Sequence, residues 1–140
     1  MSAPVAYLLD TTVLRETRRK KADPGVMAFL EAADSSALYI SVLTLGELRK
    51  GIAVKGRTDP NAAKALAGWL EGLEFGFADR ILGVDAAIAR LWGDWAADRP
   101  RPVIDTLLAA TAAQHALALV TRNTRDIADL PVKAHNPWVD

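Results

Sequence analysis

Short apolar runs alternate with segments of helical periodicity along almost the whole 140-residue chain, and this alternation limits the possible folds more than any other feature. The apolar runs are residues 5–9, 38–41, 80–84 and 118–121, with 132–134 as a possible edge strand. Strands that alternate with helices form βαβ units. The sequence therefore predicts one α/β domain over residues 1–140, with a mainly parallel sheet of four to five strands and helices on both of its faces.

Helix starts are marked by capping residues and prolines. Asp23-Pro24 and Asp59-Pro60 each combine an N-cap with a proline at the first helical position, and Asp85 precedes a third helix that stops before Pro100. The spacing predicts helices over residues 11–19, from 24 onward, 42–53, 60–73, 86–99, 103–115 and 124–128. Thr11 or Thr12 is expected to cap the first of them.

Composition excludes several kinds of chemistry. The chain has no cysteine, and its two histidines, His115 and His135, are not spaced as metal ligands, so a metal would need oxygen donors. The formal net charge is zero and gives no global sign of nucleic-acid binding. There is no apolar run long enough for a membrane span and no secretory signal pattern at the N-terminus, so a cytoplasmic protein is expected.

Four acidic residues lie where the predicted strands end or where helices leave the sheet. Asp10 directly follows the first strand, and Asp126 lies beyond the fourth. Glu47 is in the helix after the second strand, and Asp105 is near the start of a later helix. Because the functional crevice of such sheets lies at the carboxyl ends of the strands, we expect the four carboxylates to converge there. Singly, each has a plainer interpretation as a cap, a helix-dipole partner or a surface charge.

Clustered carboxylates are the ligands that Mg²⁺ and Mn²⁺ prefer. A site of this kind activates water and polarises a phosphodiester without histidine or cysteine. Thr12 and Asn123 lie near these acids in sequence and are expected to support them with hydroxyl or amide groups. Their plainer interpretations are a capping hydroxyl and a turn asparagine.

Three segments, LLDTTVL, LTLGELRKG and VIDTLLAATAAQHALALVTRNTRDI, resemble the acidic motifs of PIN-domain nucleases. They are most similar to the VapC-type toxins of bacterial toxin–antitoxin pairs, in the FitB-like branch. The resemblance implies a PIN-like three-layer α/β/α fold and a supporting hydroxyl at Thr121. It identifies four metal-site acids: Asp10, Glu47, Asp105 and Asp126.

The same resemblance implies a Mg²⁺- or Mn²⁺-dependent endoribonuclease that cleaves RNA with a carboxylate-bound, metal-activated water. It further implies a homodimer and a VapB-like antitoxin that inhibits the enzyme within a hetero-oligomer. Two alternatives stay open. One is a PIN-like binding module without catalysis, and the other is a HAD-like phosphatase, which needs a second acid two residues after Asp10, where this chain has Thr12.

Five of the seven residues at positions 15–21, RETRRKK, are basic. An acidic groove repels phosphate, so we expect a cationic surface beside it to receive the RNA backbone. The side chains proposed for this role are Arg15, Arg18, Arg19, Lys20 and Lys21. The plainer interpretation is a solvated helix end with cations near its C-terminus.

Overall fold

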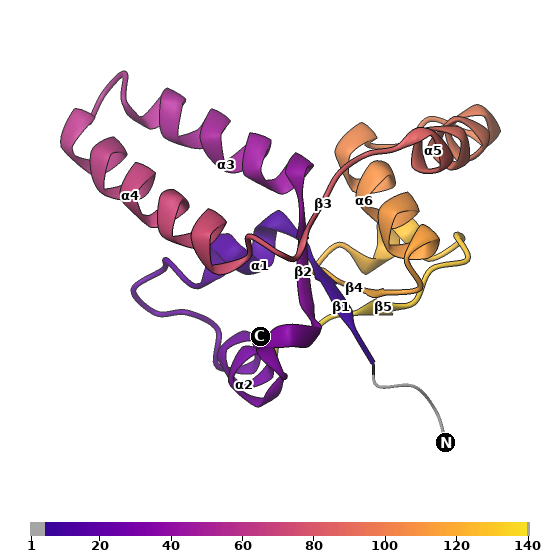
Figure 1. Cartoon of the computed structure of the whole chain (residues 1–140), viewed down its shortest axis with the longest axis horizontal. Coiled ribbons are helices and arrows are strands. Elements are labelled where there is room, and N and C mark those ends of the chain that lie inside the picture. The colour runs from indigo at the N-terminus through magenta and orange to yellow at the C-terminus, as the bar shows by residue number, and fades with distance from the viewer. Residues whose placement is uncertain (1–4, 140) are drawn as a thin grey trace.

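The computed structural model describes residues 5–139, so residues 1–4 and 140 of the expected domain lie outside the described part (Figure 1). Its strands are β1 (Tyr7–Leu9), β2 (Leu38–Ser41), β3 (Ile81–Leu82), β4 (Ala118–Val120) and β5 (Ala134–His135). Its α-helices are α1 (Thr11–Glu16), α2 (Pro24–Ala32), α3 (Val42–Lys55), α4 (Pro60–Gly76), α5 (Ala86–Asp98) and α6 (Val103–Gln114). The described residues also form two single 3₁₀ turns, η1 (Ser35–Ala37) and η2 (Thr124–Ile127).

The five strands form one sheet in the order β3-β2-β1-β4-β5, and every neighbouring pair is parallel. The sequence prediction of a mainly parallel sheet is therefore confirmed, with all strands parallel. Strand β1 is central: Leu8 is in register with Tyr39 of β2 on one side and with Leu119 of β4 on the other. Parallel strands end at a common edge, which brings the residues after β1, β2 and β4 together.

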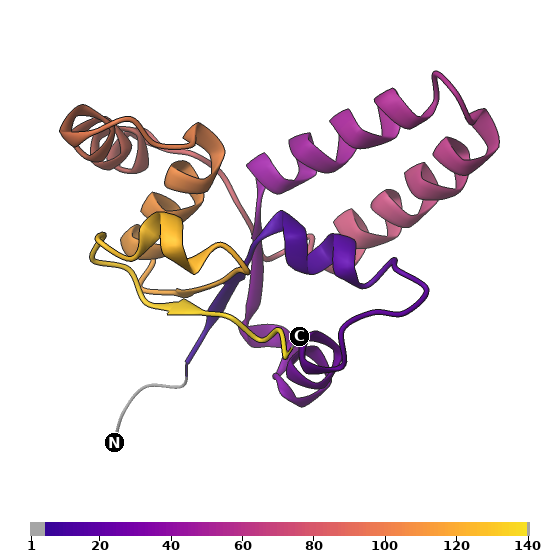
Figure 2. The same cartoon turned by 180° about the vertical axis from the view of Figure 1, so that it is seen from behind.

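Helices cover both faces of the sheet, and successive strand residues point to opposite faces. Leu9 and Val120 face a core made with α1, α2, α3 and α4, whereas Leu8 and Leu119 face a second core made with α6 and η2. Figures 1 and 2 show the α3–α4 pair on one side of the sheet and α5 and α6 on the other. The expected three-layer α/β/α arrangement is thus confirmed. Within residues 5–139, no helix is both long and apolar enough to cross a membrane.

The predicted helix caps at the three aspartates are confirmed. The side chains of Asp23, Asp59 and Asp85 each accept a hydrogen bond from the backbone N–H three residues ahead, at 2.9–3.1 Å. These bonds satisfy amides that have no partner inside the helix.

The first helix is shorter than predicted and starts differently. Asp10, rather than Thr11 or Thr12, occupies the N-cap position, and α1 ends at Glu16 instead of near Arg19. Glu16, the last residue of α1, holds the chain that follows the helix: its carboxylate accepts the N–H of Asp23 at 2.8 Å. Residues 17–22 therefore form a loop.

Two strand boundaries also differ from the prediction. Strand β3 is limited to two residues, inside the predicted 80–84. Strand β5 begins at Ala134 instead of residue 132, because pairing with β4 aligns Ala134 with Leu119. Edge strands of two residues have few ladder bonds, so tertiary pairing and not local pattern decides where they lie.

The C-terminal segment packs across the start of α2. The N–H of Val139 donates to Asp23 Oδ2 at 3.3 Å, and Trp138 Nε1 donates to Glu16 Oε1 at 3.4 Å. A Cβ on Gly25 would lie 2.2 Å from the Pro137 carbonyl oxygen. Only glycine lets the two segments approach this closely.

Candidate active site

Strands β1 and β4 end side by side, and this places two polar residues in contact. The Asp10 N–H donates to the Val120 carbonyl at 3.0 Å, so the next residue, Thr121, lies beside Asp10. Thr121 Oγ1 donates to Asp10 Oδ2 at 2.6 Å, and Thr12 Oγ1 donates to the same oxygen at 3.0 Å. Asp10 is only 4% exposed, and two hydroxyl donors hold its carboxylate in one orientation.

Thr121 is itself held in place. Its hydroxyl oxygen accepts the backbone N–H of Asn123 at 3.0 Å while its proton is donated to Asp10. Asn123, with Thr121, Asp10 and Asp105, lines a small open pocket above the sheet edge. Thr12, Thr121 and Asn123, predicted to lie around the acids, all lie at this edge.

Glu47 lies in α3, which follows β2, the strand on the other side of β1 from β4. Its side chain reaches the same sheet edge as Asp10. Thr11 Oγ1 donates to Glu47 Oε1 at 2.5 Å and is 3.1 Å from the hydroxyl oxygen of Thr44. Thr11 and Thr44 are fully buried. Sequence reasoning treated Thr11 only as a cap and did not consider Thr44 at all. Their apolar neighbours in sequence were a signal that these hydroxyls are buried and therefore hydrogen-bonded.

Asp105, in the first turn of α6, provides the electrostatic signature of the site. Burial raises the pKa of its carboxyl group to about 6, although a helix N-terminus favours the charged form. Three further carboxylates contribute to the increase through their negative charge: Asp10, Glu47 and Asp126. The other three predicted acids therefore lie within electrostatic reach of Asp105.

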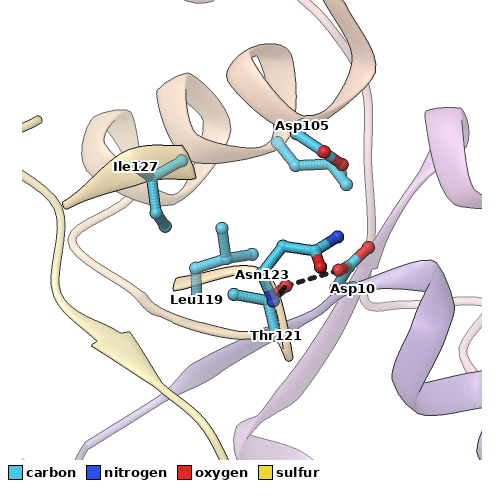
Figure 3. Close-up of a pocket in the computed structure, with 7 residues that line it drawn as sticks. Asp10, Asp105, Leu119, Thr121, Asn123 and Ile127 are labelled. Carbon is cyan, nitrogen blue, oxygen red and sulfur yellow. Dashed lines mark hydrogen bonds between the residues drawn. The ribbon is translucent and has the colours of Figure 1, made fainter. Parts of the chain in front are cut away.

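Asp126 is the most peripheral of the four acids. It is exposed and lies in the 3₁₀ turn η2, above the carboxyl end of β4. Figure 3 shows the pocket between these elements, with Asp105 on one side and Asp10, Thr121 and Asn123 on the other. Leu119 and Ile127 close its inner end, so the polar groups stand over an apolar floor.

None of the ion pairs within residues 5–139 involves the four acids. In that part of the chain, no three acidic or histidine side chains already stand close enough to hold a metal ion together. The donor set suits a hard cation that takes one or two carboxylates directly and keeps several waters, as Mg²⁺ commonly does.

The basic residues of the loop after α1 are partly engaged with other side chains. Arg19 pairs with Glu16 at 3.2 Å, and the guanidinium of Arg18 lies 5.6 Å from the centre of the Trp69 ring. Arg15 and Arg18 also border a groove with an apolar floor between α1, α3 and α4. The basic stretch thus lies one helix away from Asp10, on a surface that also carries acidic, aromatic and apolar side chains.

Comparison with known proteins agrees with this architecture. The chain matches the PIN domain over residues 7–133, and it therefore belongs to the PIN domain family. It is 32% identical to Toxin FitB of Neisseria gonorrhoeae over 140 residues, covering 95% of this chain and 99% of the relative. It is 30% identical to VapC ribonuclease Y4jK of Sinorhizobium fredii over 146 residues, covering 94% and 96%.

Solved structures lead to the same family. The crystal structure of FitAcB from Neisseria gonorrhoeae superposes with a TM-score of 0.86 at 31% identity, over 96% of this chain and 99% of that one. Toxin–antitoxin complexes are among the other structures with this fold.

Proposed function

We propose that this protein is a Mg²⁺- or Mn²⁺-dependent endoribonuclease and the toxin of a VapBC-type toxin–antitoxin pair. The observation that carries the proposal is the half-buried Asp105 carboxyl group, whose pKa is raised to about 6 first by burial and then by the negative charges of Asp10, Glu47 and Asp126. Membership of the PIN family and similarity to a toxin and to a VapC ribonuclease support it.

Asp10 and Asp105 are the residues that we assign to direct metal contact, with Glu47 and Asp126 completing the negative site. Asp10 Oδ2 already accepts two hydroxyl protons, which leaves Oδ1 for a cation. Glu47 likewise has one oxygen committed to Thr11 and one remaining. A bound divalent cation supplies Lewis acidity toward the phosphodiester and acidifies water.

The protein's own groups orient the reactants. The Thr12 and Thr121 hydroxyls fix the Asp10 carboxylate, so less ordering is needed when substrate arrives. The charge of Asp105 is the one most disfavoured without a cation, because burial and the other three carboxylates raise its pKa to about 6, so this side chain gains most from a bound divalent ion. The apolar floor of Leu119 and Ile127 keeps the dielectric low around these charges.

The RNA backbone is proposed to cross the loop after α1. Lys20 and Lys21 make none of the ion pairs found within residues 5–139, so their charge is available to phosphate. Arg15 and Arg18 stand on the same surface.

A VapB-like antitoxin is the proposed inhibitor, by analogy with the toxin–antitoxin complexes that share this fold. We also propose that the toxin itself is a cytoplasmic homodimer. Co-expression with the product of the neighbouring open reading frame should yield a hetero-oligomer without nuclease activity. Light scattering of the free and bound toxin gives both stoichiometries.

The central test is RNA cleavage by purified protein. Cleavage should require Mg²⁺ or Mn²⁺ and stop in EDTA, and Asp10→Asn should lower the rate by orders of magnitude with the fold retained. Asp94→Asn, an exposed acid of α5, is the matched control. Full activity in EDTA refutes the metal mechanism. Hydrolysis of a small phosphomonoester instead of RNA would support a phosphatase, and inactivity on both with a bound partner would support a binding module.

A further inference from the structure

All three guanidinium nitrogens of Arg101 donate hydrogen bonds. Its Nη1 and Nη2 donate to the two carboxylate oxygens of Asp129 at 3.1 and 2.8 Å. Its Nε donates to the Trp95 carbonyl at 3.0 Å, and Nη2 also reaches Asp98 at 3.3 Å. The side chain is 3% exposed, although it carries a permanent charge. Such two-point pairing of arginine with a carboxylate fixes orientation as well as distance.

The Arg101–Asp129 pair joins two segments that are 28 residues apart and that each carry one acid of the site. Arg101 stands two residues before α6, whose first turn contains Asp105. Asp129 stands two residues after η2, which contains Asp126. Two hydrogen bonds restrain the start of α6: the N–H and the hydroxyl of Thr106 both donate to the Pro102 carbonyl, at 3.1 and 2.6 Å.

Turn η2, in contrast, is weakly determined by its own backbone. The hydrogen bonds at its two ends are long: Asp126 N–H to Asn123 O is 3.3 Å, and Ala128 N–H to Arg125 O is 3.4 Å. A single 3₁₀ turn with such bonds needs external anchors to hold one conformation. One anchor is the buried side chain of Ile127, and the other is the pairing of Asp129. The Arg101 and Arg99 guanidinium groups hold the pKa of Asp129 well below its usual range, so this anchor stays charged.

We propose that Arg101 is a positioning residue of the nuclease: through Asp129 it fixes η2 and so holds the Asp126 carboxylate opposite Asp105. The inference rests on the proposed function, since it assigns Asp126 to the metal site. Arg101 touches no reacting atom in this scheme. Its effect on metal binding passes entirely through Asp126.

Calorimetry of Mn²⁺ binding to the RNA-free protein tests this route. Arg101→Gln and Asp129→Asn should each weaken Mn²⁺ binding by about 10- to 100-fold, the usual effect of removing a partner behind a metal ligand. Asp126→Asn should have a similar effect. In the Asp126→Asn background, adding Arg101→Gln should cause no further loss, because the carboxylate that it positions is gone.

Arg99→Gln is the matched control. Arg99 donates to the same carboxylate, Asp129 Oδ1 at 3.0 Å, but its side chain is 53% exposed and touches one oxygen only. Its replacement should change Mn²⁺ affinity less than about threefold, in line with the small worth of surface ion pairs. Hydrogen exchange gives a readout without metal: Arg101→Gln should accelerate exchange at residues 124–128 and spare α3.

Three outcomes overturn the inference. Arg101→Gln could lower the melting temperature and leave Mn²⁺ affinity unchanged, which would make the pair a fold-stabilising contact only. The losses from Arg101→Gln and Asp126→Asn could add in the double variant. If Arg101→Gln fails to fold, Asp129→Asn tests the same pair through its more exposed member. An unchanged Mn²⁺ affinity of Asp129→Asn would then overturn the inference. Absence of Mn²⁺ binding in the unmutated protein would instead refute the proposed function itself.

Discussion

Replacing Asp105 by asparagine should stabilise the metal-free protein at neutral pH, although it removes an acid of the site. The folded pKa of about 6 lies above the ordinary value of 3.8, so ionising this carboxyl costs more in the folded than in the unfolded state. A difference of about two units corresponds to about 3 kcal/mol. Because the carboxyl is only partly buried, solvent screening reduces this to about 1–2 kcal/mol. For a domain of this size the melting temperature should rise by about 3–6 °C.

The pH dependence gives the sign of the effect. A raised folded pKa means that the penalty in the unmutated protein is absent below about pH 4, grows as the pH rises toward 6, and is complete above it. The gain from Asp105→Asn should therefore be full at pH 7.5 and vanish near pH 4. Millimolar Mn²⁺ should reverse the order of stability, since the cation offsets the repulsion that the substitution relieves.

Thermal denaturation in EDTA, followed by circular dichroism at several pH values, measures this prediction. Asp94→Asn on α5 is the control and should change the melting temperature by less than about 1 °C, as surface substitutions usually do. A variant that is no more stable than the parent at pH 7.5, or a gain that persists unchanged at pH 4, would refute the argument from converging charges.

Three further perturbations test other parts of the structure. Replacing residues 18–20 with glutamine should reduce the slope of log affinity for RNA against log salt concentration by about one to two units, less than three lost phosphate contacts would give. Fluorescence anisotropy at several salt concentrations measures this slope. Thr121→Val removes the shorter hydrogen bond to Asp10 and should weaken Mn²⁺ binding about 10- to 100-fold, while Thr121→Ser retains it. Gly25→Ala places a Cβ 2.2 Å from the Pro137 oxygen and should cost about 1–3 kcal/mol by denaturant titration, whereas Gly46→Ala, with open space around it, should cost nothing.

The fold and the placement of two of the acids follow from local sequence pattern, because these acids lie just after strands. Asp10 comes directly after β1, and Glu47 lies in the second turn of α3, which follows β2. Asp105 differs, because its helix α6 follows α5 and leads into β4. A parallel sheet gathers its strand ends at one edge whatever the details of the helices. Hydrophobic alternation therefore predicts that Asp10 and Glu47 lie at the same edge of the sheet.

The hydroxyl network could not be predicted in the same way, because it depends on the rotation of a helix. Neighbouring positions in an α-helix point about 100° apart. Thr11 consequently turns to Glu47 while Thr12 turns back to Asp10. The packing of α1 against α3 decides which threonine donates to which acid. The sequence Thr11-Thr12 alone does not predict it.

Asp126 shows a different limit of local reasoning. It does not directly follow a strand or lie in an α-helix, and the hydrogen bonds at the two ends of its 3₁₀ turn are long. Besides the buried Ile127, the turn is restrained by Arg101, which lies 25 positions before Asp126 and pairs with Asp129. No periodic pattern in the sequence predicts this pair. A single sequence reveals such a pair only as two unremarkable surface charges.

The basic loop after α1 shows that a count of charges in sequence overstates the charge available to a ligand. Five cations within seven residues suggested one continuous phosphate-binding surface. In the folded chain Arg19 neutralises Glu16, and Arg18 lies against the Trp69 ring. Glu16 is needed there, because its carboxylate closes the loop by accepting the N–H of Asp23 and the indole N–H of Trp138. The loop thus uses part of its positive charge to hold its own shape, and the salt dependence of RNA binding should be correspondingly shallower than five phosphate contacts would give.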